Sequence, residues 1–212
     1  MRALSVLLVF VALLLASCQP AGPTTAVIET SMGNITVELN ESTPRHTENF
    51  IKLANEDFYV GTLFHRIIPN FMIQGGDPMS VDAAPNAPLG GGGPGYLIDE
   101  EIGAPHLAGA LAAARTQNPE KASSGSQFYI VTGTPQSDAT LDQIERIKGI
   151  KYNDAQRAAY REQGGRPDLD MDYTVFGQVT EGMDVVRAIA QVERNPADRP
   201  TTDVVIRSVT IQ

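Results

Sequence analysis

Short runs in which apolar and polar residues alternate recur along the chain and predict β-strands. Residues 27–29 and 35–39 lie on either side of a turn at 32–34, so they predict a hairpin. Further strands are predicted on both sides of Pro69-Asn70 and at 109–114, 127–132, 174–179 and 204–211. Alternation in the last run places four residues on one face: Val205, Arg207, Val209 and Ile211.

Two segments favour helices that frame these strands. Thr43 and Pro44 predict a helix start, with Thr43 as the N-cap, and the apolar stripe that follows includes Phe50. Residues 181–192 predict a second helix with three apolar residues on one face: Met183, Val186 and Ile189. Many short strands, two framing helices and no βαβ alternation predict one mostly β domain, an antiparallel barrel with helices at its ends.

A third segment, residues 139–165, is helical in composition and lies between two predicted strands. Asn153 and Gln156 have the spacing of a capping box, and Gly164 can end the helix that they start. We therefore expect a helical insertion at this point of the barrel.

The N-terminus has the pattern of an export signal. Met1-Arg2 supplies a positive charge, and the apolar run at 3–16 is too short to span a membrane. Residues 19–25 contain two prolines and no apolar pattern, which predicts a tether. Cys18 is the single cysteine, so a disulfide framework is excluded.

Charge and motif content exclude several other chemistries. The net charge of −9 argues against nonspecific binding to nucleic acid, which depends on Lys and Arg meeting phosphates. His65 and His106 lack the spacing of paired metal ligands, and His65 is expected to be a packed or surface residue. The glycines at 90–93 lack the lysine of a phosphate-binding loop. We expect no metal and no other cofactor.

Residues 64–77 combine one arginine and one glutamine with large apolar residues and closing glycines. In strands, Phe64 shares a face with Arg66, and Met72 shares a face with Gln74. Arginine is rarely buried unless paired. Arg66 is therefore expected to border an apolar pocket and to direct its N–H donors into it.

Three stretches of the chain resemble motifs of the cyclophilins, which are peptidyl-prolyl cis-trans isomerases: 64–77, 125–130 and 169–177. The resemblance covers residues 26–212 and implies a closed eight-stranded antiparallel barrel capped by two α-helices, with 139–165 inserted beside the active-site rim. It implies that Arg66 and Gln74 are catalytic. It also implies a set of substrate-binding residues: Phe71, Met72, Ala114, Arg115, Phe128, Tyr129, Leu169 and Tyr173.

Several residues depart from the family pattern, and four of them bear on the site or its turn. Asn70 replaces a glycine and can still adopt a left-handed backbone, and Tyr173 replaces a histidine but retains a flat ring with a polar tip. Arg115 replaces an asparagine, so it either retains a backbone contact or attracts acidic groups of a substrate. Asp168 stands where many members have tryptophan, which predicts weak cyclosporin binding.

The segment Leu15-Ala16-Ser17-Cys18 resembles the lipobox of bacterial lipoproteins. That resemblance implies a signal peptide at 1–17, a lipid on Cys18 and a lipidated tether at 18–25. It implies a place in the cell envelope, in the outer membrane if the source is Gram-negative, facing the periplasm or the exterior. The expected partners are this membrane and proline-containing unfolded or flexible polypeptides, and we expect a monomer that binds no nucleic acid.

Two alternatives to an isomerase are compatible with the sequence. One is a non-catalytic peptide-binding or chaperone lipoprotein that uses the same groove, and the other is a structural envelope lipoprotein. The insertion at 139–165 has three possible roles: it tunes substrate choice, it docks a protein partner, or it is neutral.

Overall fold

The computed structural model describes residues 22–212. The predicted signal peptide at 1–17 and the lipidation site at Cys18 lie outside the described residues, as does the first half of the predicted tether, 18–21. Within residues 22–212, no helix is long and apolar enough to cross a membrane.

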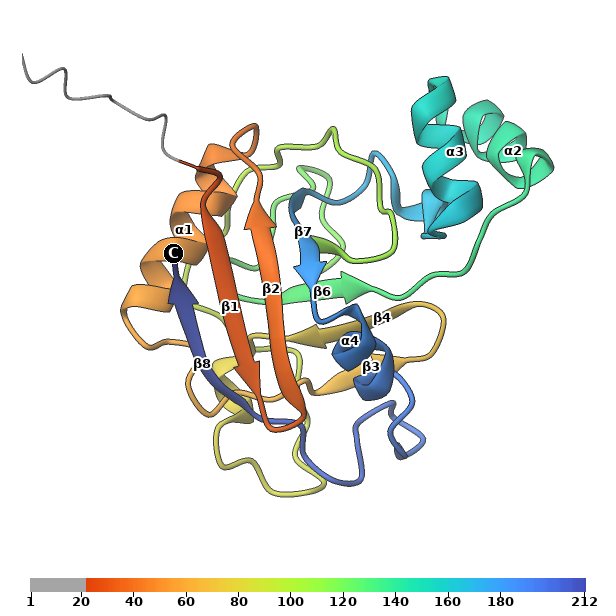
Figure 1. Cartoon of the computed structure of the whole chain (residues 1–212). Helices are drawn as coiled ribbons and strands as arrows, with labels where there is room; N and C mark the ends of the chain where they lie inside the picture. The colour runs from red at the N-terminus through yellow and green to blue at the C-terminus, as the bar shows by residue number, and fades with distance from the viewer. Residues whose placement is uncertain (1–21) are drawn as a thin grey trace, which may run out of the picture.

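Eight strands form one antiparallel sheet in the order β3-β4-β6-β5-β7-β2-β1-β8 (Figure 1). All eight predicted strands are present; β1, β2 and β7 are longer than predicted, whereas β5, β6 and β8 are shorter. Their bounds are β1 Thr25–Thr30, β2 Gly33–Leu39, β3 Arg66–Ile68, β4 Met72–Gly75, β5 Ala110–Ala113, β6 Phe128–Val131, β7 Val175–Glu181 and β8 Ile206–Ile211.

The sheet is a curled half-barrel, so the prediction of a closed barrel is wrong. β3 and β8 are its two edge strands and do not pair with each other. Between them, the irregular segment 61–64 contacts 204–206 through one isolated bridge and backbone hydrogen bonds such as Phe64 N–H to Val204 O at 2.9 Å. β3 has only three residues, and its Ile67 N–H donates to Asp198 O rather than to β8.

A bulge in the β1–β8 pairing changes which residues of β8 face the core. Glu29 pairs with Ser208, but the next residue of β1, Thr30, pairs with Ile206. The alternation is interrupted at Arg207, so Ile206 and Val209 are both buried. The prediction that Val205, Arg207, Val209 and Ile211 share one face is therefore wrong, because a bulge adds one residue to one strand of a pair.

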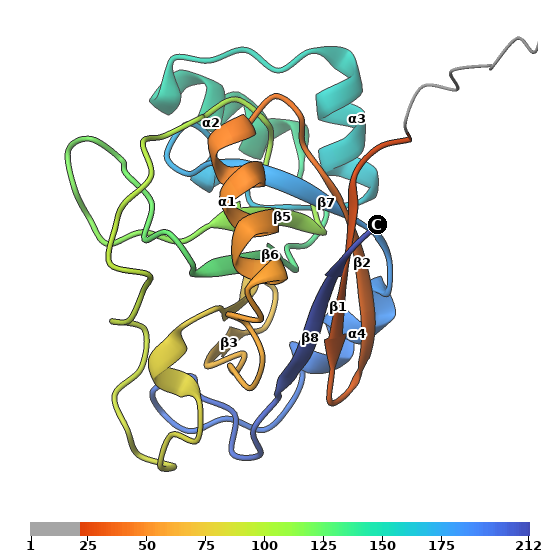
Figure 2. The ribbon, with the colours of Figure 1, turned by 90° about the vertical axis from the view of Figure 1, so that its left-hand side faces the viewer.

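In residues 22–212, four α-helices accompany the sheet: α1 Pro44–Asn55, α2 Asp138–Lys148, α3 Asp154–Glu162 and α4 Met183–Ile189. α1 packs against β8 and β7, and α4 packs against β2. α2 and α3 lie side by side at one end of the molecule (Figures 1 and 2) and occupy most of the predicted helical segment 139–165. The capping box of Asn153 and Gln156 is present at the start of α3.

The N-terminus of α1 is capped from outside the helix. Thr43 is at the N-cap position, but its side chain makes no capping hydrogen bond. The Glu101 carboxylate instead accepts from the backbone N–H groups of Arg45 and His46, at 3.1 and 3.0 Å. The helix start was predicted correctly, whereas its capping group is 56 residues away from Arg45 in the sequence.

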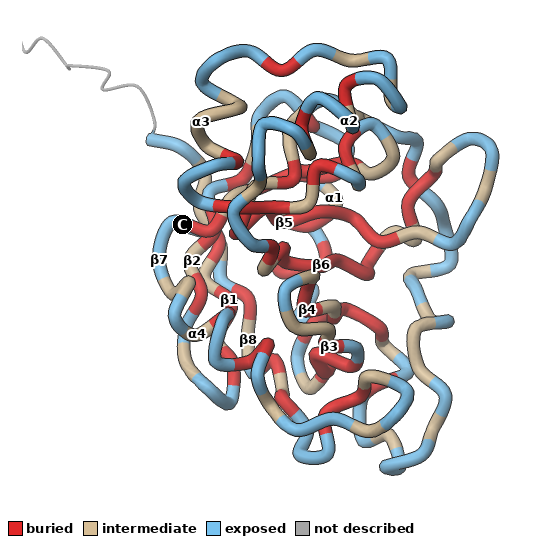
Figure 3. The backbone as a smooth tube through the Cα atoms, turned by 90° about the vertical axis from the view of Figure 1, so that its right-hand side faces the viewer, coloured by how far each residue is buried: buried red, intermediate tan, exposed pale blue. Residues whose placement is uncertain are grey.

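The two faces of the sheet pack into two different apolar clusters. The larger cluster lies between the sheet and α1, and its aromatic residues include Phe50, Tyr59, Phe64 and Phe128. The smaller cluster lies on the opposite face and includes Met72, Ala112 and Tyr129. Figure 3 shows that β5, β6 and most of β4 consist of buried residues. The alternation of each strand decides which side chains reach the smaller cluster.

Candidate active site

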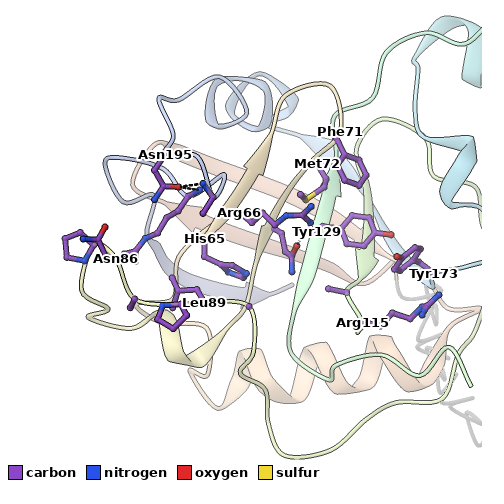
Figure 4. Close-up of a pocket in the computed structure, with 18 of the residues that line it drawn as sticks. His65, Arg66, Phe71, Met72, Asn86, Leu89, Arg115, Tyr129, Tyr173 and Asn195 are labelled. Atoms are coloured by element: carbon purple, nitrogen blue, oxygen red, sulfur yellow. Dashed lines mark hydrogen bonds between the residues drawn. The ribbon is translucent and has the colours of Figure 1, made fainter. Parts of the chain in front are cut away.

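A cavity of about 600 Å³ opens on the face of the sheet that carries the smaller cluster. Its lining comes from the β3–β4 hairpin, from Ala114 and Arg115 directly after β5, from β6, from the segment 169–173 and from two loops, 85–90 and 195–199 (Figure 4). The lining includes every substrate-binding and catalytic residue expected from the sequence apart from Phe128: Arg66, Phe71, Met72, Gln74, Ala114, Arg115, Tyr129, Leu169 and Tyr173.

Strand register brings Arg66 and Gln74 together. They are directly opposite each other in the β3–β4 pair, and Gln74 is in turn opposite Tyr129 of β6. Directly opposite residues of antiparallel strands project from the same face. Arg66 donates from Nη1 to Oε1 of Gln74 at 3.2 Å, and its guanidinium lies 5.9 Å from the centre of the Phe71 ring.

Gln127 is a polar residue of the site that the sequence analysis missed. Its Oε1 accepts from Nε2 of Gln74 at 3.0 Å, and its own Nε2 donates to the carbonyls of Gly90 and Gly92 at 3.0 and 2.7 Å. Gln127 therefore joins Gln74 to the loop that covers one side of the cavity. The available signal was its position inside the motif 125–130, where a buried glutamine requires hydrogen-bond partners.

The assignment of Phe128 to the pocket is corrected. Phe128 is buried on the core face of β6, where its ring packs edge-on against Phe50 and Phe64 at 5.8 and 6.0 Å between centroids. Tyr129, the next residue, faces the cavity. Successive side chains of a strand point to opposite faces, so the two aromatic residues cannot both line the pocket.

The apolar part of the cavity lies beside Arg66. Met72 is almost fully buried there, and Phe71 and Leu169 pack against the same cluster. Arg166 lies over the outer face of the Phe71 ring at 4.2 Å and is held by two hydrogen bonds to Asp168, at 2.8 and 2.7 Å. The apolar pocket therefore has the Arg66 guanidinium at its border.

A buried polar network supports Tyr129 from behind. The Tyr129 hydroxyl lies 3.1 Å from Nε2 of His106, whose Nδ1 lies 2.8 Å from Oδ1 of Asp170. The hydroxyls of Tyr152 and Tyr160 donate to Oδ2 of Asp170 at 2.6 and 2.5 Å. Burial raises the pKa of Tyr129 and of the other two tyrosines, so all three hydroxyls are protonated donors at neutral pH. This network connects α3 and the α2–α3 connection with the cavity wall.

Arg115 and Tyr173 form the rim of the cavity. The Arg115 guanidinium lies 4.7 Å from the centre of the Tyr173 ring, and its Nε donates to the Asp172 carbonyl at 3.0 Å. Lys121 and Lys148 pair with the Asp172 carboxylate, so α2 is attached to the same rim segment.

His65 lies beneath the loop at Gly90. It is buried, and neither ring nitrogen has a hydrogen-bond partner in the described part of the chain. Burial lowers the pKa of His65, so the ring is neutral at pH 7. Among residues 22–212, no three His, Cys, Asp or Glu side chains gather as metal ligands would.

Comparisons with known proteins agree on one family. Residues 25–211 match the sequence model described as cyclophilin type peptidyl-prolyl cis-trans isomerase/CLD. A Staphylococcus aureus (strain USA300) protein named "Putative peptidyl-prolyl cis-trans isomerase" is 33% identical over 192 residues, which are 90% of this chain and 93% of that protein.

Two further proteins are similar to the chain. A Streptococcus pyogenes serotype M6 protein named "Putative bifunctional phosphatase/peptidyl-prolyl cis-trans isomerase" is 37% identical over 189 residues, 87% of this chain but only 38% of that protein. A crystal structure of a Cryptosporidium parvum cyclophilin type peptidyl-prolyl cis-trans isomerase, determined in the presence of the dipeptide Ala-Pro, superposes with a TM-score of 0.65 at 23% identity. That match covers 89% of this chain and 98% of the other.

The extent of these matches decides the family. The family model covers almost all of the described residues, and the S. aureus relative is matched over nearly its whole length. The chain therefore belongs to the cyclophilin-type peptidyl-prolyl cis-trans isomerases and is an enzyme of that type.

Proposed function

We propose that Arg66 accelerates rotation about Xaa-Pro bonds by stabilising the twisted prolyl transition state. Uncatalysed rotation faces a barrier of about 20 kcal/mol, which comes from amide resonance. The twisted amide loses this resonance, and its nitrogen gains a lone pair that can accept a hydrogen bond. A donor directed at that nitrogen stabilises the transition state but not the planar ground state, and this difference is what lowers the barrier.

The observation that supports the proposal is the position of the Arg66 guanidinium beside the apolar pocket. Phe71, Met72 and Leu169 offer a site for the proline ring. Arg66 uses only Nη1 in its hydrogen bond to Gln74, and its remaining N–H groups have no acceptor among the described residues. These groups are free to donate to the prolyl nitrogen, while Gln74 holds the guanidinium and the adjacent substrate backbone.

The proposed substrates are proline-containing segments of exported proteins that are still folding. The supporting observations are the apolar run at 3–16 and the lipobox-like segment that ends at Cys18. A lipid on Cys18 holds the domain at the membrane, on the side where exported chains fold. Cells that express the full chain and are fed labelled palmitate should label the wild type and not Cys18→Ser. Equal labelling of both would contradict the anchor.

Catalysed cis-to-trans isomerisation of a short Ala-Pro peptide tests the role of Arg66. Arg66→Ala in the full chain should lower kcat/KM by about 100- to 1,000-fold, the usual result of removing a donor to a transition state. Arg66→Lys is the matched variant, because it retains the charge but not the planar fork of donors. A wild-type protein that binds the peptide without accelerating its isomerisation would favour the non-catalytic binding module instead.

A further inference from the structure

The cavity lining is cationic although the protein is acidic. The net charge of the chain is −9, yet the described residues that line the cavity include Arg66, Arg115 and Arg199 and no Asp or Glu. A cleft lined by one sign of charge concentrates ligands of the opposite sign. The lining therefore favours a polypeptide with carboxylates near its proline.

The three arginines differ in their availability to a ligand. Arg199 is almost fully buried, donates to the carbonyls of Ala83 and Ala84, and pairs with Asp203 at 3.2 Å. Arg66 and Arg115 form no ion pair in the described part of the chain. These two guanidiniums are the charges that a substrate can reach.

Arg115 is held in one orientation before any substrate arrives. Its Nε donates to the Asp172 carbonyl at 3.0 Å, and its guanidinium lies 4.7 Å from the centre of the Tyr173 ring. Nη1 makes only a long 3.4 Å contact with the Thr116 carbonyl, and Nη2 has no acceptor among residues 22–212. A guanidinium fixed in this way loses little conformational entropy when it binds a carboxylate.

Two carboxylates of the segment 168–172 already have other partners. Asp172 pairs with Lys121 at 3.0 Å and also with Lys148, and Asp168 pairs with Arg166 at 2.7 Å. Neither of these two carboxylates pairs with Arg115. In Figure 4, Tyr129 and Tyr173 lie between Arg66 and Arg115. The pocket between the two arginines is therefore bordered by a cation at each end.

We propose that Arg115 makes this isomerase prefer Xaa-Pro segments with Asp or Glu next to the proline. The proposal rests on the proposed function, because it places the proline in the pocket between Arg66 and Arg115. A carboxylate on a residue adjacent to the proline would accept from the free Nη groups of Arg115.

Matched peptides that differ only beside the proline test the preference. The full chain is assayed with peptides that have Glu, Gln or Lys either before or after the proline, at low and at high salt. The expected ratio of kcat/KM for Glu over Gln is about three- to tenfold at low salt on one of the two sides, and it should fall at high salt. Lys peptides should be the poorest substrates.

Three variants assign the preference to one residue. Arg115→Gln should bring the Glu/Gln ratio close to one, and Arg115→Lys should retain most of it. Arg207→Gln is the control, because it removes the same charge from an exposed position on β8 that does not line the cavity. An equal fall of the ratio in Arg207→Gln would show a general effect of net charge and would overturn the assignment to Arg115.

A binding measurement separates this proposal from the proposed function. If no peptide is isomerised, the proposed function fails, but fluorescence titration of the same peptides still compares Glu with Gln. A wild-type ratio near one in both assays would overturn the preference even if turnover is fast. A ratio that survives Arg115→Gln would also overturn it.

Discussion

The two sides of the cavity are built in different ways. On the β3–β4 side, Arg66 is exposed, and its single side-chain hydrogen bond in the described chain is the 3.2 Å contact with Gln74. On the Tyr129 side, Asp170 and His106 are buried, and Asp170 accepts hydrogen bonds from His106, Tyr152 and Tyr160. The β3–β4 side thus presents a cation with one side-chain hydrogen bond, whereas the polar groups on the Tyr129 side are buried and hydrogen-bonded to one another.

Under the proposed function, this difference separates Arg66, which would act on the substrate, from the residues that hold the pocket. A guanidinium with a single hydrogen bond keeps free N–H groups that can donate to the reacting bond. Its removal should therefore change the free energy of unfolding little. A buried network contributes to stability because each of its polar groups is paired, and removal of its centre leaves several groups unpaired. Activity and stability should therefore respond to different substitutions on the two sides.

The largest expected effect is on stability, from Asp170→Ala. The substitution leaves His106, Tyr152 and Tyr160 without an acceptor in a buried site, so we expect a loss of about 3–5 kcal/mol in the free energy of unfolding. Urea denaturation followed by far-UV circular dichroism measures this loss. Asp170→Asn retains one oxygen and should lose less. A loss below about 1 kcal/mol for Asp170→Ala would contradict the importance of the network.

Arg66→Ala should lower isomerase activity strongly and leave stability almost unchanged. The expected fall of 100- to 1,000-fold in kcat/KM corresponds to about 3–4 kcal/mol of transition-state stabilisation. The free energy of unfolding should change by less than about 0.5 kcal/mol, as for other surface substitutions. Denaturation curves and isomerase assays on the same preparations make the comparison. Parallel losses of stability and turnover would show that the two sides are not separable.

A second His–carboxylate pair sharpens the comparison, with the smallest expected effect. Partial burial raises the pKa of Glu101, but hydrogen bonds from His46 and from the backbone N–H groups of His46 and Arg45 outweigh this and hold the pKa below its usual value. The stabilisation is therefore complete above the usual carboxyl pKa and is lost as the pH falls through the lowered pKa.

Glu101→Gln should therefore cost about 1–2 kcal/mol at pH 7 and make stability less dependent on pH between about 5 and 3. Urea denaturation at pH 7, 5 and 3 measures both effects. Burial lowers the pKa of His46, and the hydrogen bond and charge of Glu101 partly offset this lowering. His46 therefore also reduces stability as the pH falls below its usual pKa of about 6.5, which is why the comparison of the two proteins is made at pH 5 and 3 as well as at pH 7. An unchanged slope below pH 5 in the variant would contradict the role of the carboxylate.

The sequence predicted the secondary structure well where the signal is local. Asn70 has the left-handed backbone expected of the turn before β4, with φ of 59°. The capping box of α3 and the start of α1 depend on residues within a few positions of each other, and both were predicted correctly. The predictions that failed are the closed barrel and the face of β8, because edge pairing and a bulge depend on segments far apart in the chain.

Predictions of the site likewise succeeded where the contacts are local in the sequence and failed where they join distant segments. The motif at 64–77 was sufficient to bring Arg66 and Gln74 to one place, because the hairpin that joins them is local. The motif at 125–130 was not sufficient to choose between Phe128 and Tyr129, since the choice depends on which face of β6 meets the core. Gln127 was missed because its partners at Gly90 and Gly92 lie more than 30 residues away.

By itself, the sequence determined the family resemblance, the positions of the strands and helices, and the residue types at the pocket. Only the tertiary structure decided that the sheet stays open, that Asp170 connects His106 with Tyr152 and Tyr160, and that Arg115 is fixed over Tyr173. The physical reason is the separation along the sequence of the residues that interact. Turns, caps and alternation depend on neighbours in the chain, whereas the Asp170–His106 contact joins residues 64 positions apart and exists only after the chain has folded.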